Sequence, residues 1–108
     1  MIVCAPVTSD EHIDPYLDRA DWIVVAEVIN GEIVSWQDID VLWSLLHDSG
    51  AYGSHHDRIV KFLSEHRIEA IVANHMGDDM VRILKTKGTP VHLGATGNAR
   101  TAVKTSIT

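Results

Sequence analysis

The chain has 108 residues, 45% of them hydrophobic and 22% charged, which fits one folded domain over residues 1–108. Its formal net charge is −6 and no Lys/Arg-rich run is visible. This argues against a nucleic-acid partner, because counterion release needs clustered basic side chains. No signal-peptide pattern and no apolar run of membrane-spanning length are present, so we expect a cytoplasmic protein without a membrane partner. The single cysteine, Cys4, cannot form an intramolecular disulfide, which fits a reducing compartment.

The first half of the chain predicts three strands, the last two joined as a hairpin. Residues 2–7 form a short apolar run typical of a buried strand, and the polar residues 8–19 predict a loop. Residues 22–29 are rich in Val and Ile, and residues 32–39 alternate along a second strand. Asn30-Gly31 between them favours a type I′ turn, because both residues tolerate positive φ.

The second half predicts helices that alternate with strands. Residues 41–52 carry apolar side chains at helical spacing, and Asp40 is the expected N-cap. Ser54 and Asp57 have capping-box spacing at the start of a helix that runs to about Arg67. The remaining elements are a strand over 69–73, a helix over 78–87 ended by Gly88, a strand over 91–93, a helix over 98–104 and a frayed tail over 105–108.

The order of these elements predicts the architecture. A strand and a hairpin are followed by helix, strand, helix, strand and helix. A hairpin beside right-handed βαβ crossovers gives an α/β fold: a mixed five-stranded sheet with flanking helices, in three layers.

The chain carries seven histidines, and some of them provide its main chemical signal. His55 and His56 lie at a predicted helix start, and His75 lies in the loop before the next helix. If both loops face one crevice, the imidazoles could coordinate a metal or the edge of a metal–sulfur cluster. The alternative is that they are solvated polar residues at helix starts. His66 is interpreted as structural, and His92 as a satisfied or exposed side chain in a strand.

Two further features leave their roles open. The turn Gly94-Ala95-Thr96-Gly97 could present backbone N–H groups as an anion nest, or be a tight turn without a ligand. Cys4 could be a thiolate ligand, although a small buried hydrophobic residue in a strand is the simpler interpretation.

Several short motifs together resemble one protein family. They are Ile13-Asp14-Pro15 with Asp18-Arg19-Ala20, the strand and turn over 24–33, Gly53-Ser54-His55, the loop 73–77, and Leu93-Gly94-Ala95-Thr96-Gly97. In order and spacing, over nearly the whole chain, they resemble the dinitrogenase iron–molybdenum cofactor biosynthesis family, which includes small carriers of nitrogenase cofactor precursors.

This resemblance implies a ribonuclease-H-like fold and a non-enzymatic role related to nitrogen fixation. The protein would bind, store or pass on an iron–sulfur or iron–molybdenum type cluster, exchanging it with a donor or acceptor protein. The implied cluster contacts are His55, Asn74, His75, Met76, Gly77 and the turn Gly94 to Gly97 with Thr96.

The chain departs from the family pattern at one segment. Family members usually carry His-Phe-Gly-Arg-Ala near the N-terminus, where this chain has Tyr16-Leu17-Asp18-Arg19-Ala20. We hypothesise that His12, His56 and His75 offset the missing histidine. The predicted metal ligands are therefore His55, His75 and His12, with His56 as an added cofactor contact.

Other functions stay open at the level of sequence. A regulatory or protein-interaction domain of the same fold could use Trp22, Trp36 and Trp43 at an interface, although core packing explains them better. An exposed hairpin edge could pair with a second copy, so a monomer or a weak homodimer is expected. A metal-dependent hydrolase is a third interpretation, but no spacing selects a reaction.

Overall fold

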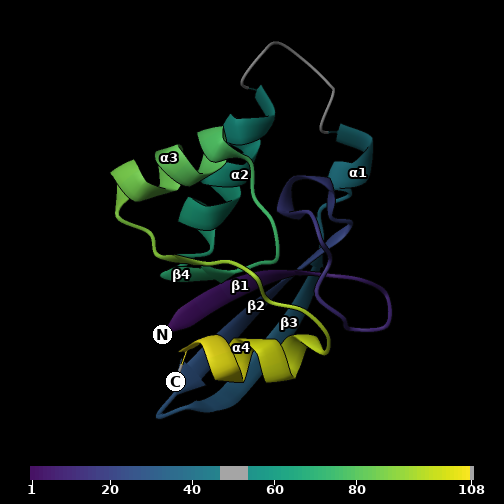
Figure 1. Cartoon of the computed structure of the whole chain (residues 1–108), viewed down its shortest axis with the longest axis vertical. Coiled ribbons are helices and arrows are strands. Elements are labelled where there is room, and N and C mark those ends of the chain that lie inside the picture. Colours follow the sequence, from purple (N-terminus) through teal and green to yellow (C-terminus); the bar gives the residue numbers. More distant parts are fainter. Residues whose placement is uncertain (47–53, 108) are drawn as a thin grey trace.

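The computed structural model describes residues 1–46 and 54–107. Its strands form one five-stranded sheet in the order β3-β2-β1-β4-β5 (Figure 1). They are β1 (Ile2–Val7), β2 (Trp22–Ile29), β3 (Glu32–Asp40), β4 (Ala70–Val72) and β5 (Val91–His92). The helices are η1 (Leu17–Arg19), α1 (Trp43–Leu46), α2 (Ser54–Glu65), α3 (Asp78–Lys87) and α4 (Ala99–Ile107). β1 pairs antiparallel with β2 and parallel with β4, and β4 pairs parallel with β5, so the predicted mixed sheet is confirmed.

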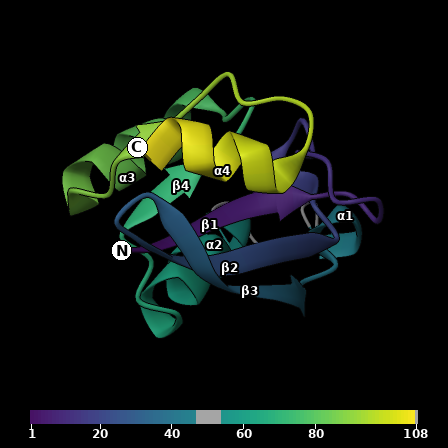
Figure 2. The same cartoon turned by 90° about the horizontal axis from the view of Figure 1, so that it is seen from below.

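Helices cover both faces of this sheet (Figures 1 and 2). Successive residues of a strand point to opposite faces, so β1 contributes to both layers. Val3 and Ala5 pack on the side of α4, whereas Cys4 packs on the side of α2 and α3. A strand covered on both faces must be apolar throughout, which explains the continuous apolar run of β1.

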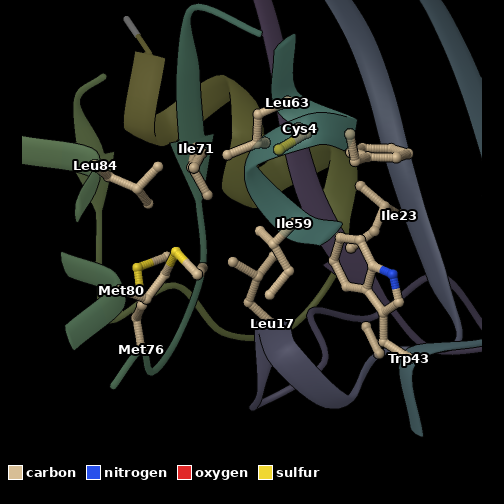
Figure 3. Close-up of a cluster of buried hydrophobic side chains, with 13 residues drawn as sticks. Cys4, Leu17, Ile23, Trp43, Ile59, Leu63, Ile71, Met76, Met80 and Leu84 are labelled. Atoms are coloured by element: carbon tan, nitrogen blue, oxygen red, sulfur yellow. The ribbon is translucent and has the colours of Figure 1, made fainter. Parts of the chain in front are cut away.

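Two separate cores result from this layering. The first, called here the α2/α3-side core, is partly drawn in Figure 3 and centres on the fully buried Ile23, Ile59, Ile71 and Leu84. The second, the α4-side core, centres on the fully buried Val3, Val24, Val72 and Val103. Each core joins strands to helices that lie far away in the sequence, so the sheet and its layers depend on one another.

Local sequence signals account for the hairpin and for α3. Asn30 and Gly31 have φ values of 53° and 79°, the left-handed conformation that a type I′ turn requires. Helix α3 spans the predicted residues and ends at Gly88, whose φ of 80° lets its N–H donate to the carbonyl of Leu84. Both predictions are confirmed. Helix α2 begins at Ser54 and carries Asp57 in its first turn, but it ends at Glu65, two residues before the predicted end.

The predicted helix over 41–52 is wrong at its start. Asp40 is the last residue of β3 instead of an N-cap, and the helix begins at Trp43. The N–H groups of Val41 and Leu42 donate to the carbonyl of Asp21, at 2.9 and 3.1 Å, and this turns the chain before it becomes helical. Residues 47–52 of the predicted helix lie outside the described residues.

The predicted frayed tail is also wrong up to residue 107. Helix α4 continues to Ile107, because this side chain packs against the α4-side core. Its N-terminus is fixed by Asn98, whose Oδ1 accepts a hydrogen bond of 3.0 Å from the N–H of Thr101. Thr108 lies outside the described residues.

The tryptophans mostly pack inward. Trp43 is only 3% exposed in the α2/α3-side core, and Trp22 and Trp36 are partly buried against the α4-side core. The guanidinium carbon of Arg100 lies 4.5 Å from the centroid of the Trp36 ring, a cation–π distance. The core interpretation of these residues therefore agrees with the structure, and an interface role stays a prediction. No helix in the described ranges is long and apolar enough to cross a membrane.

Burial of Leu84 provides a test of the α2/α3-side core. Leu84 is 0% exposed, so Leu84→Ala is expected to lower the free energy of unfolding by about 2–5 kcal/mol, measured by urea denaturation. Leu45 is 74% exposed, and Leu45→Ala is the matched control with an expected change within about 0.5 kcal/mol. Equal losses in the two variants would contradict this assignment of the core.

Candidate functional site

Three loops meet where the parallel strands end. Residues 8–16 follow β1, residues 73–77 follow β4, and residues 93–98 follow β5. Because these three strands are parallel, their carboxyl ends open at the same edge of the sheet, the usual place for a binding site in an α/β fold. We call these segments the carboxyl-edge loops.

Backbone hydrogen bonds join the first and third of these loops. The N–H of Ile13 donates to the carbonyl of Gly97, and the N–H of Ala99 donates to the carbonyl of Glu11, both at 2.8 Å. His12 and Asn98 form an isolated antiparallel bridge between these contacts. His12 is thereby placed beside the glycine turn.

The second loop is joined to both of its neighbours. The N–H of His75 donates to the carbonyl of Pro15 at 3.2 Å, and Tyr16 and His75 form an isolated parallel bridge. Asn74 accepts a backbone hydrogen bond of 3.0 Å from Gly94, and its side-chain Nδ2 donates to the carbonyl of Ala95 at 3.1 Å. The side chain of Asn74 thus holds two loops together.

His12 and His75 both lie at the surface of this edge. The Nδ1 atom of His12 is 3.5 Å from Oδ2 of Asp10. A hydrogen bond of 2.6 Å from Oγ1 of Thr8 holds the pKa of the Asp10 carboxyl below its usual value. The ring of His75 meets the ring of Tyr16 edge-on, with centroids 5.6 Å apart. Both imidazoles remain accessible to a ligand.

The glycine turn has the backbone that its sequence suggests. Gly94 and Gly97 have φ values of 85° and 78°, which favour glycine, while the space beside each is open. Two N–H groups of the turn are already used, because Gly94 donates to Asn74 and Ala95 donates to Ala73. The exposed Thr96 and Gly97 form the part of the turn that faces solvent.

His55 lies apart from these loops, in a buried position on the first turn of α2. Its ring is 7% exposed and meets Trp43 edge-on. Nε2 is 2.6 Å from the carbonyl of Asp18 and Nδ1 is 2.7 Å from Nη1 of Arg58. A carbonyl only accepts and a guanidinium only donates, so these contacts select the neutral tautomer with its proton on Nε2. Metal coordination by His55 would require breaking one of the two hydrogen bonds.

His56 and Gly77 line a different feature, a small cavity between η1 and the first turns of α2 and α3. Its volume is about 120 Å³, and its lining residues are Leu17, Asp18, His56, Met76, Gly77, Asp79 and Met80. The structure therefore divides the predicted contacts. Met76 and Gly77, the last residues of the loop 73–77, line this cavity with His56, whereas His12, Asn74, His75 and the glycine turn are parts of the carboxyl-edge loops outside its lining. Over residues 1–46 and 54–107, no three His, Cys, Asp or Glu side chains are grouped so that they could hold a metal ion.

Cys4 lies inside the α2/α3-side core. It is 1% exposed, and burial raises the pKa of its thiol to about 12. The interpretation of Cys4 as a small buried hydrophobic residue agrees with this position. A thiolate ligand at this position would have to form without solvent.

Comparison with known proteins shows which family this chain matches. The family model described as "Dinitrogenase iron-molybdenum cofactor" matches residues 1–108. No curated protein is detectably similar in sequence.

Solved structures match the fold over nearly the whole chain. The apo form of the orange protein from Desulfovibrio gigas has a TM-score of 0.74 at 15% identity, covering 95% of this chain and 83% of that one. A candidate NifB protein from Thermotoga has a TM-score of 0.68 at 19% identity, covering 94% and 83%. A candidate dinitrogenase from Methanocaldococcus jannaschii has a TM-score of 0.62 at 13% identity, covering 96% and 85%. At these identities the likeness establishes the fold.

The burial of Cys4 predicts a protected thiol. At pH 8, iodoacetamide should modify Cys4 about 100-fold more slowly in the folded chain than in urea, because the reactive thiolate is suppressed and covered. Mass spectrometry of samples taken over time measures both rates. The unfolded thiol ionises near pH 8.5, so the folded state holds the extra proton above that pH and stability should fall as the pH rises towards 12. Similar modification rates in both states would contradict the buried position.

The two hydrogen bonds of His55 predict a structural cost for its removal. His55→Ala should lower the free energy of unfolding by about 1–3 kcal/mol, because Arg58 and the carbonyl of Asp18 lose a buried partner. The neighbouring His56→Ala should cost clearly less in the same urea titration, since that ring is more exposed. The reverse order would show that His55 has no structural role.

Proposed function

The chain belongs to the dinitrogenase iron–molybdenum cofactor family, and from this we propose that it is a small carrier that binds and passes on a metal–sulfur cluster. The cluster would be an iron–sulfur or iron–molybdenum type species, taken from a donor protein and given to an acceptor. The observation that carries the proposal is the joining of the three carboxyl-edge loops, with His12 beside the glycine turn and His75 on the loop between, in a chain whose residues 1–108 match this family.

The chemistry of the carboxyl-edge loops suits a loosely held cargo. Imidazole nitrogens can coordinate iron and molybdenum-containing species by replacing weakly bound ligands. An exposed imidazole can also release such a species to another protein. Both His12 and His75 are exposed, whereas Asn74 holds the loops in register. The solvent-facing Thr96 and Gly97 would contact the sulfur face of an anionic cluster through the backbone.

The other predicted contacts enter the proposal in a second place. His56 and Gly77 line the cavity beside the starts of α2 and α3, and His55 lies next to it. Because both ring nitrogens of His55 are hydrogen-bonded, we assign it a positioning role: it ties Asp18 of η1 to Arg58 of α2. Its coordination of a metal stays a prediction that the same reconstitution can test.

Several wider assignments follow from the proposal. The strand order β3-β2-β1-β4-β5 supports the ribonuclease-H-like label for the fold. A fold name does not imply nuclease activity, and we propose a non-enzymatic carrier. The buried free thiol of Cys4 fits the reducing interior of a cell, in line with a cytoplasmic carrier.

Anaerobic reconstitution with iron, sulfide and molybdate tests the carrier proposal. After desalting, the chain should keep stoichiometric metal and show a charge-transfer band in visible absorption. The double variant His12→Ala/His75→Ala should keep about tenfold less metal, because two accessible ligands are lost.

The control for this experiment is His66→Ala. His66 packs on Phe62 with ring centroids 4.4 Å apart and lies outside the carboxyl-edge loops, so this variant should keep the cluster. Full metal retention in the double variant would overturn the assigned site, and retention lost only in a His55 variant would move the site to α2. A colourless, metal-free wild-type protein would favour the interaction-domain alternative.

A further inference from the structure

Two thioethers and one imidazole line the cavity beside the start of α3. Met76 and Met80 are 6% and 4% exposed, and His56 belongs to the same wall. In Figure 3 the side chains of Met76 and Met80 extend towards one another. The two methionines are four residues apart across Gly77, the N-cap of α3, which brings them to one side of the helix start.

We propose that this cavity binds a single soft monovalent ion, Cu(I), through the sulfur atoms of Met76 and Met80 and an imidazole nitrogen of His56. Thioether sulfur is a soft donor that selects Cu(I) over the hard cations and over zinc, and imidazole completes a low-coordinate neutral set. Methionine has three rotatable bonds, so both sulfur atoms can adjust to an ion without a change in the backbone. This mononuclear site uses Met76 of the loop 73–77 but neither of the cluster ligands proposed above, His12 and His75, and it goes beyond the cluster carrier.

His56 differs from its neighbour His55 in the hydrogen bonding of its ring. His55 uses both ring nitrogens in hydrogen bonds, whereas the described part of the chain offers the ring of His56 no hydrogen-bond partner. An imidazole in the wall of a cavity with an open nitrogen is available as a metal ligand.

The size and the charge of the cavity fit an ion. A volume of about 120 Å³ is well below the roughly 300–1,000 Å³ that organic ligands occupy. The N-termini of α2 and α3 carry partial positive charge that would disfavour a cation. The carboxylate of Asp18 in the lining offsets this charge, whereas that of Asp79, also in the lining, lies 3.4 Å from Nη1 of Arg82 and is shared with it.

Packing alone explains part of this arrangement. Met76 and Met80 belong to the α2/α3-side core, so apolar packing alone accounts for their burial. Replacement by leucine separates the two roles, because leucine keeps the volume and the apolar contact but removes the sulfur.

Methyl NMR gives the most direct test, since the chain has three methionines and one of them serves as an internal control. In protein labelled with ¹³C at the methionine methyl groups, anaerobic addition of Cu(I), or of Ag(I) as a redox-stable substitute, should shift the signals of Met76 and Met80. The signal of Met1, which is 50% exposed at the start of the chain, should stay in place. Zn(II) should shift none of the three. Equal shifts for all three methionines, or no shift at all, would overturn the proposal.

Affinity provides the second readout. Competition with the chromogenic Cu(I) chelator bicinchoninate should give one bound ion per chain, measured in the Cys4→Ala background to exclude thiol binding. Met76→Leu/Met80→Leu and His56→Gln should each weaken binding by about tenfold or more, with His92→Gln as the histidine control. Unchanged affinity in the leucine variant, with its fold verified by circular dichroism, would contradict the assigned ligands.

The two proposals fail independently. Loss of Cu(I) binding in Met76→Leu/Met80→Leu with normal cluster reconstitution would establish a separate site. Loss of both in this variant would mean that the cavity belongs to the cluster site, and the mononuclear assignment would be withdrawn.

Discussion

The parallel pairing of β1 with β4 fixes the place at which the loops of this protein meet. Val3 pairs with Ala70 and Ile71 pairs with Val91, so three strands from distant parts of the chain run in one direction. Their connections must cross the sheet, and α2 and α3 do so on one face while burying the face of β1 that carries Cys4. The loops after these strands therefore gather at one edge. His12 and His75 lie on loops at this same edge because of this register, although nothing in their local sequences joins them.

Local chemistry made parts of this fold predictable. Asn30-Gly31 specifies its turn by positive φ alone, and Gly88 ends α3 by the same means, so both features could be predicted without knowing any tertiary contact. The mixed five-stranded sheet and its three layers follow from the sequence of elements and the handedness of crossovers. The predicted position of His75 in a loop at the sheet edge also follows from this order.

Features that depend on distant partners could not be predicted. The chain turns at Val41 and Leu42 because the carbonyl of Asp21 accepts both N–H groups, and helical spacing of apolar residues does not show that acceptor. Helix α4 extends to Ile107 because the side chain of Ile107 packs against the α4-side core. The predicted ligand His55 hydrogen-bonds a carbonyl 37 residues away, and a backbone acceptor leaves no signature in the sequence. The place of Met80 in one cavity wall with His56 depends on how α2 and α3 meet.

The contrast between His55 and His56 shows how a helix gives identical neighbours different chemistry. Consecutive residues of an α-helix point about 100° apart, so only one of the two rings can face the core. His55 takes that direction and meets Trp43, Asp18 and Arg58, which use up both of its nitrogens. His56 is turned towards the cavity at the start of α3, where the wall offers thioethers and carboxylates. His55 thus holds η1 against α2, while His56 keeps a ring nitrogen open for a ligand. By fixing the start of α2, His55 also sets the position of His56 in the cavity wall.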